Sequence, residues 1–229
     1  YDADYSHLFV RNLDIRAKKT LARFKTIDVL VNNAGIGYFG TFEESDIKEA
    51  KYMFDVNVWG LVDMTRAVLP TMREQHSGVI VNFSSIGGLY SFPTLSFYHG
   101  TKYAVEGISE SIAKETDKLG IKVMIVEPSG FRTDWAGRSS QKTMPSHNDY
   151  AQFSEFISNN AKGAHHEPGD PELAALIIVD QVTNNFSGLP LRLPLGQTAI
   201  DLATKKYETS LEKFKKVRKL SISADKPEK

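Results

Sequence analysis

Three side chains near the middle of the chain have the types and spacing for acid–base chemistry: Ser85, Tyr98 and Lys102. Tyr98 and Lys102 are four residues apart, so on a helix they share one face and lie one turn apart. A phenol with an unperturbed pKa of about 10 is a poor acid or base at neutral pH, but a nearby ammonium group lowers that pKa. A serine hydroxyl can bind a carbonyl or alcohol oxygen while the phenol moves the proton. A Tyr and a Lys at this spacing also occur on solvated helix faces, so the surrounding sequence decides between the two interpretations.

The elements that must position these residues alternate between strand and helix patterns. Near-continuous apolar runs at residues 28–34, 78–84 and 121–127 are typical of buried parallel strands. Weaker strands are predicted at residues 8–15 and 191–193. Helices are predicted at residues 16–25, 45–76 (with a bend or a new turn at Pro70), 97–119, 170–185 and 198–219. This alternation predicts an α/β fold, a doubly wound parallel sheet with three α/β/α layers.

Two segments have a distinctive composition. Residues 134–169 are polar and rich in Ser, Asn and Gly, which predicts a mobile substrate flap with one short helix near residues 150–159. Residues 189–229 are expected to form a C-terminal strand and helix. The basic cluster of that helix lies opposite an apolar face, so we interpret it as a solvated surface rather than as a site for an acidic partner.

The composition restricts the class of protein. The chain has 229 residues, 41% of them hydrophobic and 24% charged, which suits a single soluble domain over residues 1–229. Lys and Arg balance Asp and Glu at 28 each, so we expect neither nucleic acid nor a membrane as partner. Cysteine is absent and the adjacent His165 and His166 have no ligand cluster around them, so no metal site is expected. The first residues are polar and unlike a signal peptide, which favours a cytoplasmic location.

Unusual residues follow each of the predicted buried strands. Amides, serines and glycines occupy residues 32–35, 84–85 and 128–130, directly after the three apolar runs. In an open parallel sheet the ligand crevice lies at the carboxyl ends of the strands. The sequence therefore predicts a ligand site at that edge of the sheet.

This series, together with Asn57 inside a helix and the Tyr98-x-x-x-Lys102 pair, resembles the short-chain dehydrogenase/reductase family from about residue 13 to residue 133. Residues 131–135 and 189–194 resemble its subgroup of 17-beta-hydroxysteroid-dehydrogenase-like oxidoreductases. The resemblance implies a Rossmann-like fold and an oxidoreductase that moves a hydride between a nicotinamide and a carbonyl or secondary alcohol carbon. The cofactor it implies is NADP or NAD, with NADP slightly favoured.

The resemblance also implies residue roles. Tyr98 would be the general acid/base and Ser85 would orient the reacting oxygen. Lys102 would lower the pKa of Tyr98 and bind the nicotinamide ribose, and Asn57 would hold a water that relays protons. The implied cofactor-binding residues, beside Tyr98 and Lys102, are Asp14, Ile15, Asn33, Ala34, Gly35, Pro128, Ser129, Gly130 and Thr133.

If the fold holds, an aromatic and apolar set should surround the substrate, which suits a bulky or apolar carbonyl or alcohol. Taken singly, each of these residues could equally be an ordinary core or loop anchor. The set is Phe39, Ile86, Tyr90, Phe92, Phe131 and Trp135. In the family that the chain resembles, the helices corresponding to residues 45–76 and 97–119 form subunit interfaces, so a homodimer or homotetramer is expected.

One departure from the family is large. The family opens with a strand, a glycine-rich turn that holds the cofactor pyrophosphate, a helix and a second strand, and this sequence contains no such βαβ unit. We expect the working protein to include further residues that form it. Two other hypotheses stay open: a cofactor-free protein that binds a hydrophobic ligand, and a non-redox lyase or isomerase that uses Ser85, Tyr98 and Lys102 without nicotinamide.

Overall fold

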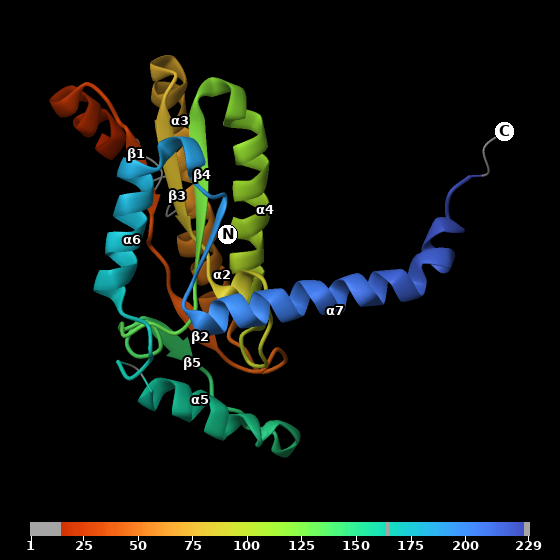
Figure 1. Ribbon diagram of the computed structural model, residues 1–229. Helices are drawn as coiled ribbons and strands as arrows, with labels where there is room; N and C mark the ends of the chain where they lie inside the picture. Colours follow the sequence, from red (N-terminus) through yellow and green to blue (C-terminus); the bar gives the residue numbers. More distant parts are fainter. Residues whose placement is uncertain (1–14, 164, 227–229) are drawn as a thin grey trace.

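The central sheet consists of four parallel strands, three of which are the long apolar runs of the sequence. The computed structural model describes residues 15–163 and 165–226. In this part of the chain the strand order is β1-β3-β4-β6 (Figure 1), and every pairing is parallel. The strands are β1 (Val29–Asn32), β3 (Gly78–Phe83), β4 (Ile121–Pro128) and β6 (Arg192–Leu195). The predicted α/β class and parallel sheet are confirmed.

Helices cover both faces of the sheet, which gives the predicted three layers (Figure 1). On one face lie the helix over residues 15–24, α3 (Gly60–Gln75) and α4 (Ser96–Thr116). Side chains of all three reach a common apolar core against the strands, which includes Ala17, Leu30, Val68, Met72, Ile80, Ile112 and Val123. On the opposite face α6 (Pro171–Asn184) packs through Ile178 against Val79, Val81 and Met124.

The predicted helix over residues 45–76 is interrupted, but not at Pro70. It consists of α2 (Ile47–Phe54), a π-helical turn at Asp55–Trp59 and then α3, which runs through Pro70 without a break. A π-turn inserts one extra residue into the helix and often occurs at functional sites. Here the turn contains Asn57, whose side chain bonds to the backbone of Ile36. The irregularity therefore marks a tertiary contact that helical periodicity does not reveal.

Local signals explain where the other elements begin and end. Asp170 caps α6, its carboxylate accepting from the backbone N–H of Glu172 at 2.9 Å, and Pro171 occupies the first turn, as predicted. After α4 a 3₁₀ turn (Asp117–Leu119) leads to Gly120, which has a φ of 71°. A Cβ at Gly120 would lie 2.2 Å from the carbonyl oxygen of His76, so only glycine fits there.

The segment over residues 134–169 is more structured than the predicted flap. It contributes β5 (Ser140–Lys142), which pairs in parallel with β2 (Gly37–Phe39), and α5 (Phe153–Lys162). Glu44 fastens it further, because its carboxylate accepts from the backbone N–H groups of Ser146 and His147 at 2.7 and 2.9 Å. The sequence predicted the short helix, which is α5, but not the strand, because short polar strands have no apolar periodicity and are defined by their partners.

The β1 edge of the sheet has no partner strand within the described ranges. Val29 and Val31 on this strand are 40% and 51% exposed. The neighbouring layer is open as well, since α6 exposes Leu173, Leu176, Ile177 and Val179. The strand predicted at residues 8–15 lies outside the described residues except for Ile15, which belongs to the helix over residues 15–24.

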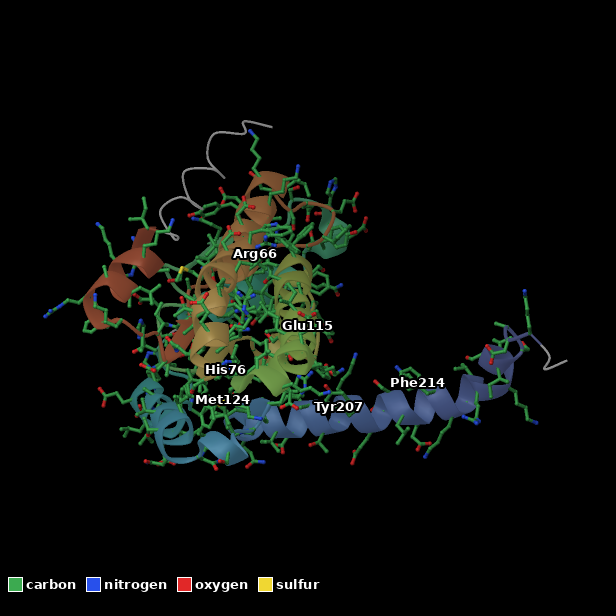
Figure 2. The ribbon with its side chains drawn as sticks, turned by 90° about the horizontal axis from the view of Figure 1, so that it is seen from above. Arg66, His76, Glu115, Met124, Tyr207 and Phe214 are labelled. Atoms are coloured by element: carbon green, nitrogen blue, oxygen red, sulfur yellow. The ribbon has the colours of Figure 1, made fainter. Side chains whose placement is uncertain are left out.

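The last element is α7 (Gln197–Ile222), the longest helix of the described chain. Its first turns pack against the 3₁₀ turn η2 (Ile86–Gly88), through Ala199 and Ala203 on the helix and Ile86 on the turn. Beyond this contact the helix leaves the body of the protein, as Figure 1 and the perpendicular view in Figure 2 both show. No helix in the described part of the chain is long and apolar enough to cross a membrane.

Candidate active site

The predicted acid–base residues meet at the carboxyl edge of the sheet. Ser85 follows β3 in extended backbone, and Tyr98 and Lys102 lie one turn apart near the start of α4. The Ser85 hydroxyl accepts a hydrogen bond from the backbone N–H of Gly87 at 3.0 Å. Its own proton can therefore be donated, in this structure to the phenol oxygen of Tyr98. The residues come together because β3 ends at the same edge at which α4 begins.

Tyr98 is buried, and burial raises the pKa of its phenol to about 12. The Ser85 hydroxyl, which hydrogen-bonds the phenol, opposes this rise. The expected lowering of this pKa by Lys102 stays a prediction. The Nζ of Lys102 lies 5.8 Å from the centroid of the Tyr98 ring and donates to the backbone oxygen of Phe83 at 2.9 Å. Desolvation is the largest influence on the pKa of this phenol, which favours the protonated form at neutral pH.

Lys102 is buried as well, and burial lowers its pKa to about 8. The negative charge of Glu106, one turn further along α4, opposes this decrease. At pH 7 the side chain is thus mostly an ammonium group, but it titrates much closer to neutrality than an exposed lysine.

Asn57 connects three segments around this pair. Its Oδ1 accepts from the backbone N–H of Ile36 at 2.8 Å, and its Nδ2 donates to the Ile36 oxygen at 2.9 Å and to Thr101 Oγ1 at 3.1 Å. Both amide N–H groups are therefore used within the protein, while Oδ1 keeps one lone pair. A Cβ on Gly35 would lie 3.6 Å from this Oδ1 and 3.6 Å from Lys102 Nζ. The loop after β1, the π-turn and α4 thus converge at Gly35.

The predicted cofactor residues lie along the same edge, in two loops. Asn33, Ala34 and Gly35 directly follow β1, and the first two are exposed. Pro128 ends β4, and the next residue, Ser129, is bonded through its backbone N–H and its hydroxyl to the Leu195 oxygen at the end of β6. Gly130 continues this loop and accepts from the backbone N–H of Gly169, and Thr133 Oγ1 accepts from the N–H of Trp135. Asp14 lies outside the described residues, and Ile15 is exposed on its helix.

The six residues predicted to surround the substrate do not form one cluster. Phe39, Phe92 and Trp135 belong to the apolar group around Tyr98, and the Trp135 and Tyr98 rings are 4.8 Å apart between centroids. Ile86 and Tyr90 pack against α7, and the ring of Tyr90 also lies 5.2 Å from that of Phe92 between centroids. Phe131 belongs to the core beneath α6. The aromatic lining at Tyr98 is therefore smaller than expected, because two loops use their apolar side chains to anchor helices.

His99 was not singled out in the sequence, yet it fixes the loop beside Ser85. One ring nitrogen, Nδ1, lies 2.7 Å from the Gly87 oxygen, and Nε2 accepts from the backbone N–H of Phe92 at 2.8 Å. Burial lowers the pKa of His99, which favours the neutral ring with the proton on Nδ1. The only signal in the sequence was its position next to Tyr98.

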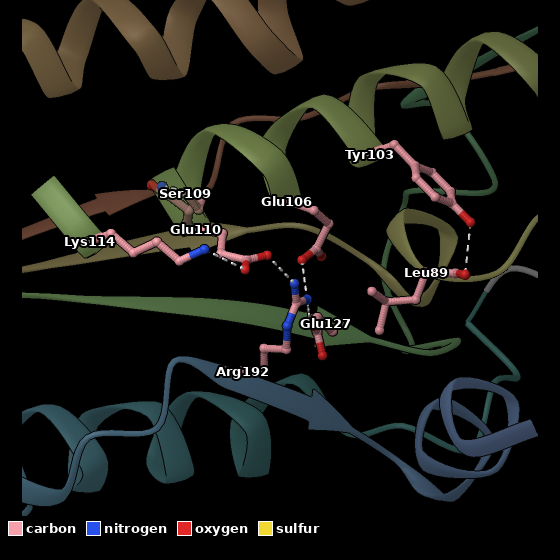
Figure 3. Close-up of polar contacts among 9 residues, drawn as sticks. Leu89, Tyr103, Glu106, Ser109, Glu110, Lys114, Glu127 and Arg192 are labelled. Atoms are coloured by element: carbon pink, nitrogen blue, oxygen red, sulfur yellow. Dashed lines mark hydrogen bonds and ion pairs between the residues drawn. The ribbon is translucent and has the colours of Figure 1, made fainter. Parts of the chain in front are cut away.

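A partly buried ionic cluster lies beside α4, beyond Lys102 along the helix (Figure 3). Arg192 on β6 binds the carboxylates of Glu106 and Glu127 through Nη1, with 2.7 Å to Glu127, and that of Glu110 through Nη2 at 3.2 Å. Burial, and then the charge of Glu106, raise the pKa of Glu127 to about 7. The signal in the sequence was the four-residue spacing from Tyr98 through Lys102 and Glu106 to Glu110.

In the described chain no group of three His, Asp or Glu residues is arranged to hold a metal ion.

Comparison with known proteins agrees with this fold. The sequence model of the family described as short chain dehydrogenase matches residues 11–144. The oxidoreductase BOA17 of Botryotinia fuckeliana is 36% identical over 202 residues, which cover 88% of this chain and 73% of that protein. The 3-ketodihydrosphingosine reductase of Bacteroides thetaiotaomicron is 41% identical over 126 residues, 55% of this chain and 47% of that protein. The crystal structure of a short-chain dehydrogenase from Streptomyces avermitilis superimposes with a TM-score of 0.84 at 37% identity, covering 95% of this chain and 78% of that one.

A parallel α/β sheet with helices on both faces, and with a Ser, a Tyr and a Lys at its carboxyl edge, defines a Rossmann-like protein. The chain belongs to the short-chain dehydrogenase family, an oxidoreductase family.

Proposed function

We propose that this protein transfers a hydride between NAD(P)(H) and a carbonyl or secondary alcohol carbon, with Tyr98 as the general acid/base. The observation that carries the proposal is the buried Tyr98 phenol between Ser85 and Lys102 at the carboxyl edge of the sheet. When bound, the nicotinamide supplies or accepts the hydride. The protein's own residues hold the reacting oxygen and move the proton.

The protonation states suit the proton-donating step of carbonyl reduction. With a pKa of about 12, Tyr98 carries its proton at neutral pH and can donate it to a carbonyl oxygen that becomes an alcohol. The Ser85 hydroxyl, which accepts from Gly87 and keeps its own proton, would donate to the same oxygen. The Lys102 ammonium, mostly charged at pH 7, would stabilise the phenolate that remains after the transfer.

The residues present fit a nicotinamide ribose at Gly35. Lys102 Nζ donates one hydrogen bond, to Phe83, so further N–H groups are available for ribose hydroxyls. Asn57 Oδ1 keeps one lone pair near the same point. We assign Asn33, Ala34, Gly35, Pro128, Ser129, Gly130 and Thr133 to the cofactor side of the site, with NADP slightly preferred to NAD.

Completion of the cofactor site is part of the proposal. The free edge of β1 and the exposed Val29 and Val31 are what a sheet presents where further strands pair and a further helix packs. We propose that a βαβ unit outside the described residues pairs there and binds the pyrophosphate. An intact mass above the 25.6 kDa of the 229 residues would support this unit, and an equal mass would argue against it.

We propose a bulky, apolar ketone as the substrate. The apolar group around Tyr98 includes three aromatic side chains, Phe39, Phe92 and Trp135. One relative is named 3-ketodihydrosphingosine reductase. Apolar walls with a few polar groups select such ligands.

A cytoplasmic location remains our prediction.

The test is oxidation of NADPH and NADH, followed by absorbance, with a panel of apolar ketones and with Tyr98→Phe as the key variant. We expect turnover to fall on the order of 10²–10⁴-fold in the variant, while NADPH titration gives a similar dissociation constant. Turnover that survives in Tyr98→Phe would refute the assigned acid/base. Ligand binding without cofactor binding would favour the hydrophobic-ligand protein, and a redox-neutral product that depends on Tyr98 would favour the lyase or isomerase.

A further inference from the structure

Two buried oxygens beside the candidate site have no hydrogen-bond partner among the described residues. They are the hydroxyl oxygen of Ser84 and Oε1 of Glu106, on residues that are 3% and 5% exposed. Both oxygens face the same point, since a Cβ on Gly88 would lie 2.5 Å from Ser84 Oγ and 3.0 Å from Glu106 Oε1. Buried polar groups of this kind are typically bridged by an ordered internal water. One shared partner would therefore satisfy both oxygens.

The charges around this point favour a water over a metal ion as that partner. Lys102 Nζ donates to the carbonyl oxygen of Phe83, the residue before Ser84, and the charge of Glu106 acts on this ammonium group. On the other side, Nη1 of Arg192 binds the second oxygen of Glu106. A metal ion placed between two cationic side chains is repelled by both. A water instead donates to the carboxylate and accepts from an O–H or N–H group.

Glu106 is one member of a pair of buried carboxylates. Nη1 of Arg192 binds both Glu106 and Glu127 (Figure 3), and the two carboxylates also hydrogen-bond each other. Two carboxylates form such a bond only when one of them carries a proton, and like charges at close range favour that state. Burial, and then the charge of Glu106, raise the pKa of Glu127 to about 7. The pair therefore holds one proton that it can release near neutral pH.

The other titratable groups around the pair lie further from Lys102. Glu110, one turn beyond Glu106 on α4, binds Nη2 of Arg192 and is 41% exposed. Tyr207 on α7 also faces the cluster, and burial raises the pKa of its phenol, so it stays neutral near pH 7. The cluster thus has a half-exposed end at Glu110 and a buried end toward Lys102.

We propose that Ser84 and Glu106 bind one internal water that passes protons from the Glu106–Glu127 pair to Lys102. The inference rests on the proposed function, in which Tyr98 loses a proton in each carbonyl reduction. Lys102 then gives a proton to the phenolate and becomes a neutral amine. The carboxyl O–H bond of the pair breaks, the water accepts that proton and releases one of its own, and a new N–H bond forms at Lys102. One proton moves, no electron is transferred, and the half-exposed end of the cluster takes up the next proton from solvent.

This route differs from the relay that we expect through Asn57. Asn57 lies on the side of Lys102 that faces Gly35, where its amide binds Ile36 and Thr101. The route through Ser84 leads instead to the carboxylates on α4 and β4. The two routes share only Lys102, so substitutions can separate them.

Reduction of a ketone takes up one proton from solvent, so proton uptake can be followed separately from NADPH oxidation. Stopped-flow absorbance is recorded for a single turnover of the full-length chain with NADPH, an apolar ketone and a pH indicator. We expect Ser84→Ala to oxidise NADPH within about twofold of the unmodified rate, because Tyr98 starts with its own proton, but to take up the solvent proton at least about fivefold more slowly. Glu127→Gln, which has no proton to give, should show the same separation.

Ser109→Ala is the matched control. It removes a buried hydroxyl from the same helix, but this hydroxyl accepts from Asn82 at 2.8 Å and does not bind the cluster. Both rates should therefore change by the same factor in this variant. Proton uptake that slows in Ser109→Ala as much as in Ser84→Ala, with NADPH oxidation unchanged in both, would overturn the proposal.

Two further readouts do not depend on catalysis. A crystal structure of the unmodified chain should show an ordered water bonded to Ser84 Oγ and Glu106 Oε1, and Ser84→Ala should lose it. Infrared spectra below about pH 7 should show a carboxylic acid band that Glu127→Gln removes and Ser84→Ala shifts.

Three outcomes would overturn the proposal: a direct hydrogen bond between Ser84 and Glu106 without a water, a missing carboxylic acid band, or proton uptake in Ser84→Ala as fast as in the unmodified chain. Failure of the proposed function has a different signature. A chain that keeps the water and the band but oxidises no NADPH with any ketone would refute the reductase activity. Normal NADPH oxidation with unchanged proton uptake in Ser84→Ala would refute only the water route.

Discussion

Lys102 and Glu106 lie one turn apart on α4, and the carboxylate of Glu106 is the charge that supports the pKa of the buried Lys102 ammonium. Glu106 is itself held by Arg192 and leaves its second oxygen, Oε1, without a hydrogen-bond partner among the described residues. The acid–base pair is therefore connected, through one helix face, to an ionic cluster on β4 and β6. We therefore expect Glu106, which lies outside the Tyr98-x-x-x-Lys102 motif, to be a positioning residue for Lys102.

Replacement of Glu106 by Gln should move the pH profile of catalysis. Without this charge, burial should lower the pKa of Lys102 below about 8, so the ammonium form is lost at lower pH. The high-pH limb of kcat should therefore move to lower pH, and turnover at pH 8 should decrease roughly three- to tenfold, because less of Lys102 remains an ammonium group there. Glu110→Gln, on the same face but half-exposed and a turn further from Lys102, is the matched control. An unchanged profile with reduced stability would mean that Glu106 is only structural.

Glu127 should make stability depend on pH between about 5 and 7. Its pKa is raised to about 7 in the folded protein, so over this range the folded state keeps a proton that the unfolded state has released. The free energy of unfolding should therefore decrease as pH rises from about 4.5 to 7. Glu127→Gln should flatten this dependence, as measured by urea unfolding at pH 5 and pH 7.5. Equal slopes for the two proteins would show that Glu127 does not titrate in this range.

Asn57→Ala should be one of the more destabilising substitutions in the site. It removes three hydrogen bonds and leaves both backbone polar groups of Ile36 without their partner. Unsatisfied buried groups cost about 1–3 kcal/mol each, so a loss of roughly 3 kcal/mol is expected in chemical denaturation. Asn184→Ala, at an exposed position on α6 where the side chain bonds only Asp180, should change stability by less than about 0.5 kcal/mol. Comparable losses in the two variants would contradict the bracing role of Asn57.

Gly120→Ala should destabilise the protein, whereas Gly107→Ala should not. Gly120 has a positive φ, and an added Cβ would meet the His76 oxygen at 2.2 Å, so a loss of more than about 1 kcal/mol is expected. Gly107 lies inside α4 with nothing within 4 Å of an added Cβ, so alanine should stabilise the helix by about 0.5–1 kcal/mol. Thermal unfolding of the two variants should move in opposite directions. A change in the same direction would argue against the conformation of the turn at Gly120.

The sequence by itself determined the parallel sheet and its long apolar strands, and it singled out the residues that we propose for acid–base chemistry. Apolar runs of strand length with glycine or proline at their ends indicate buried strands, and this signal is local in the sequence. The four-residue spacing of Tyr98 and Lys102 places both on one face of any helix that contains them. The tertiary structure decided the rest. The pKa of the Tyr98 phenol depends on its desolvation by Trp135 and the neighbouring side chains. The ionic cluster of Glu106, Glu127 and Arg192 joins three elements that are distant in the chain. The strand pairing of residues 140–142 and the exposure of the last turns of α7 also depend on which surfaces of the protein meet. The local sequence pattern does not encode these contacts.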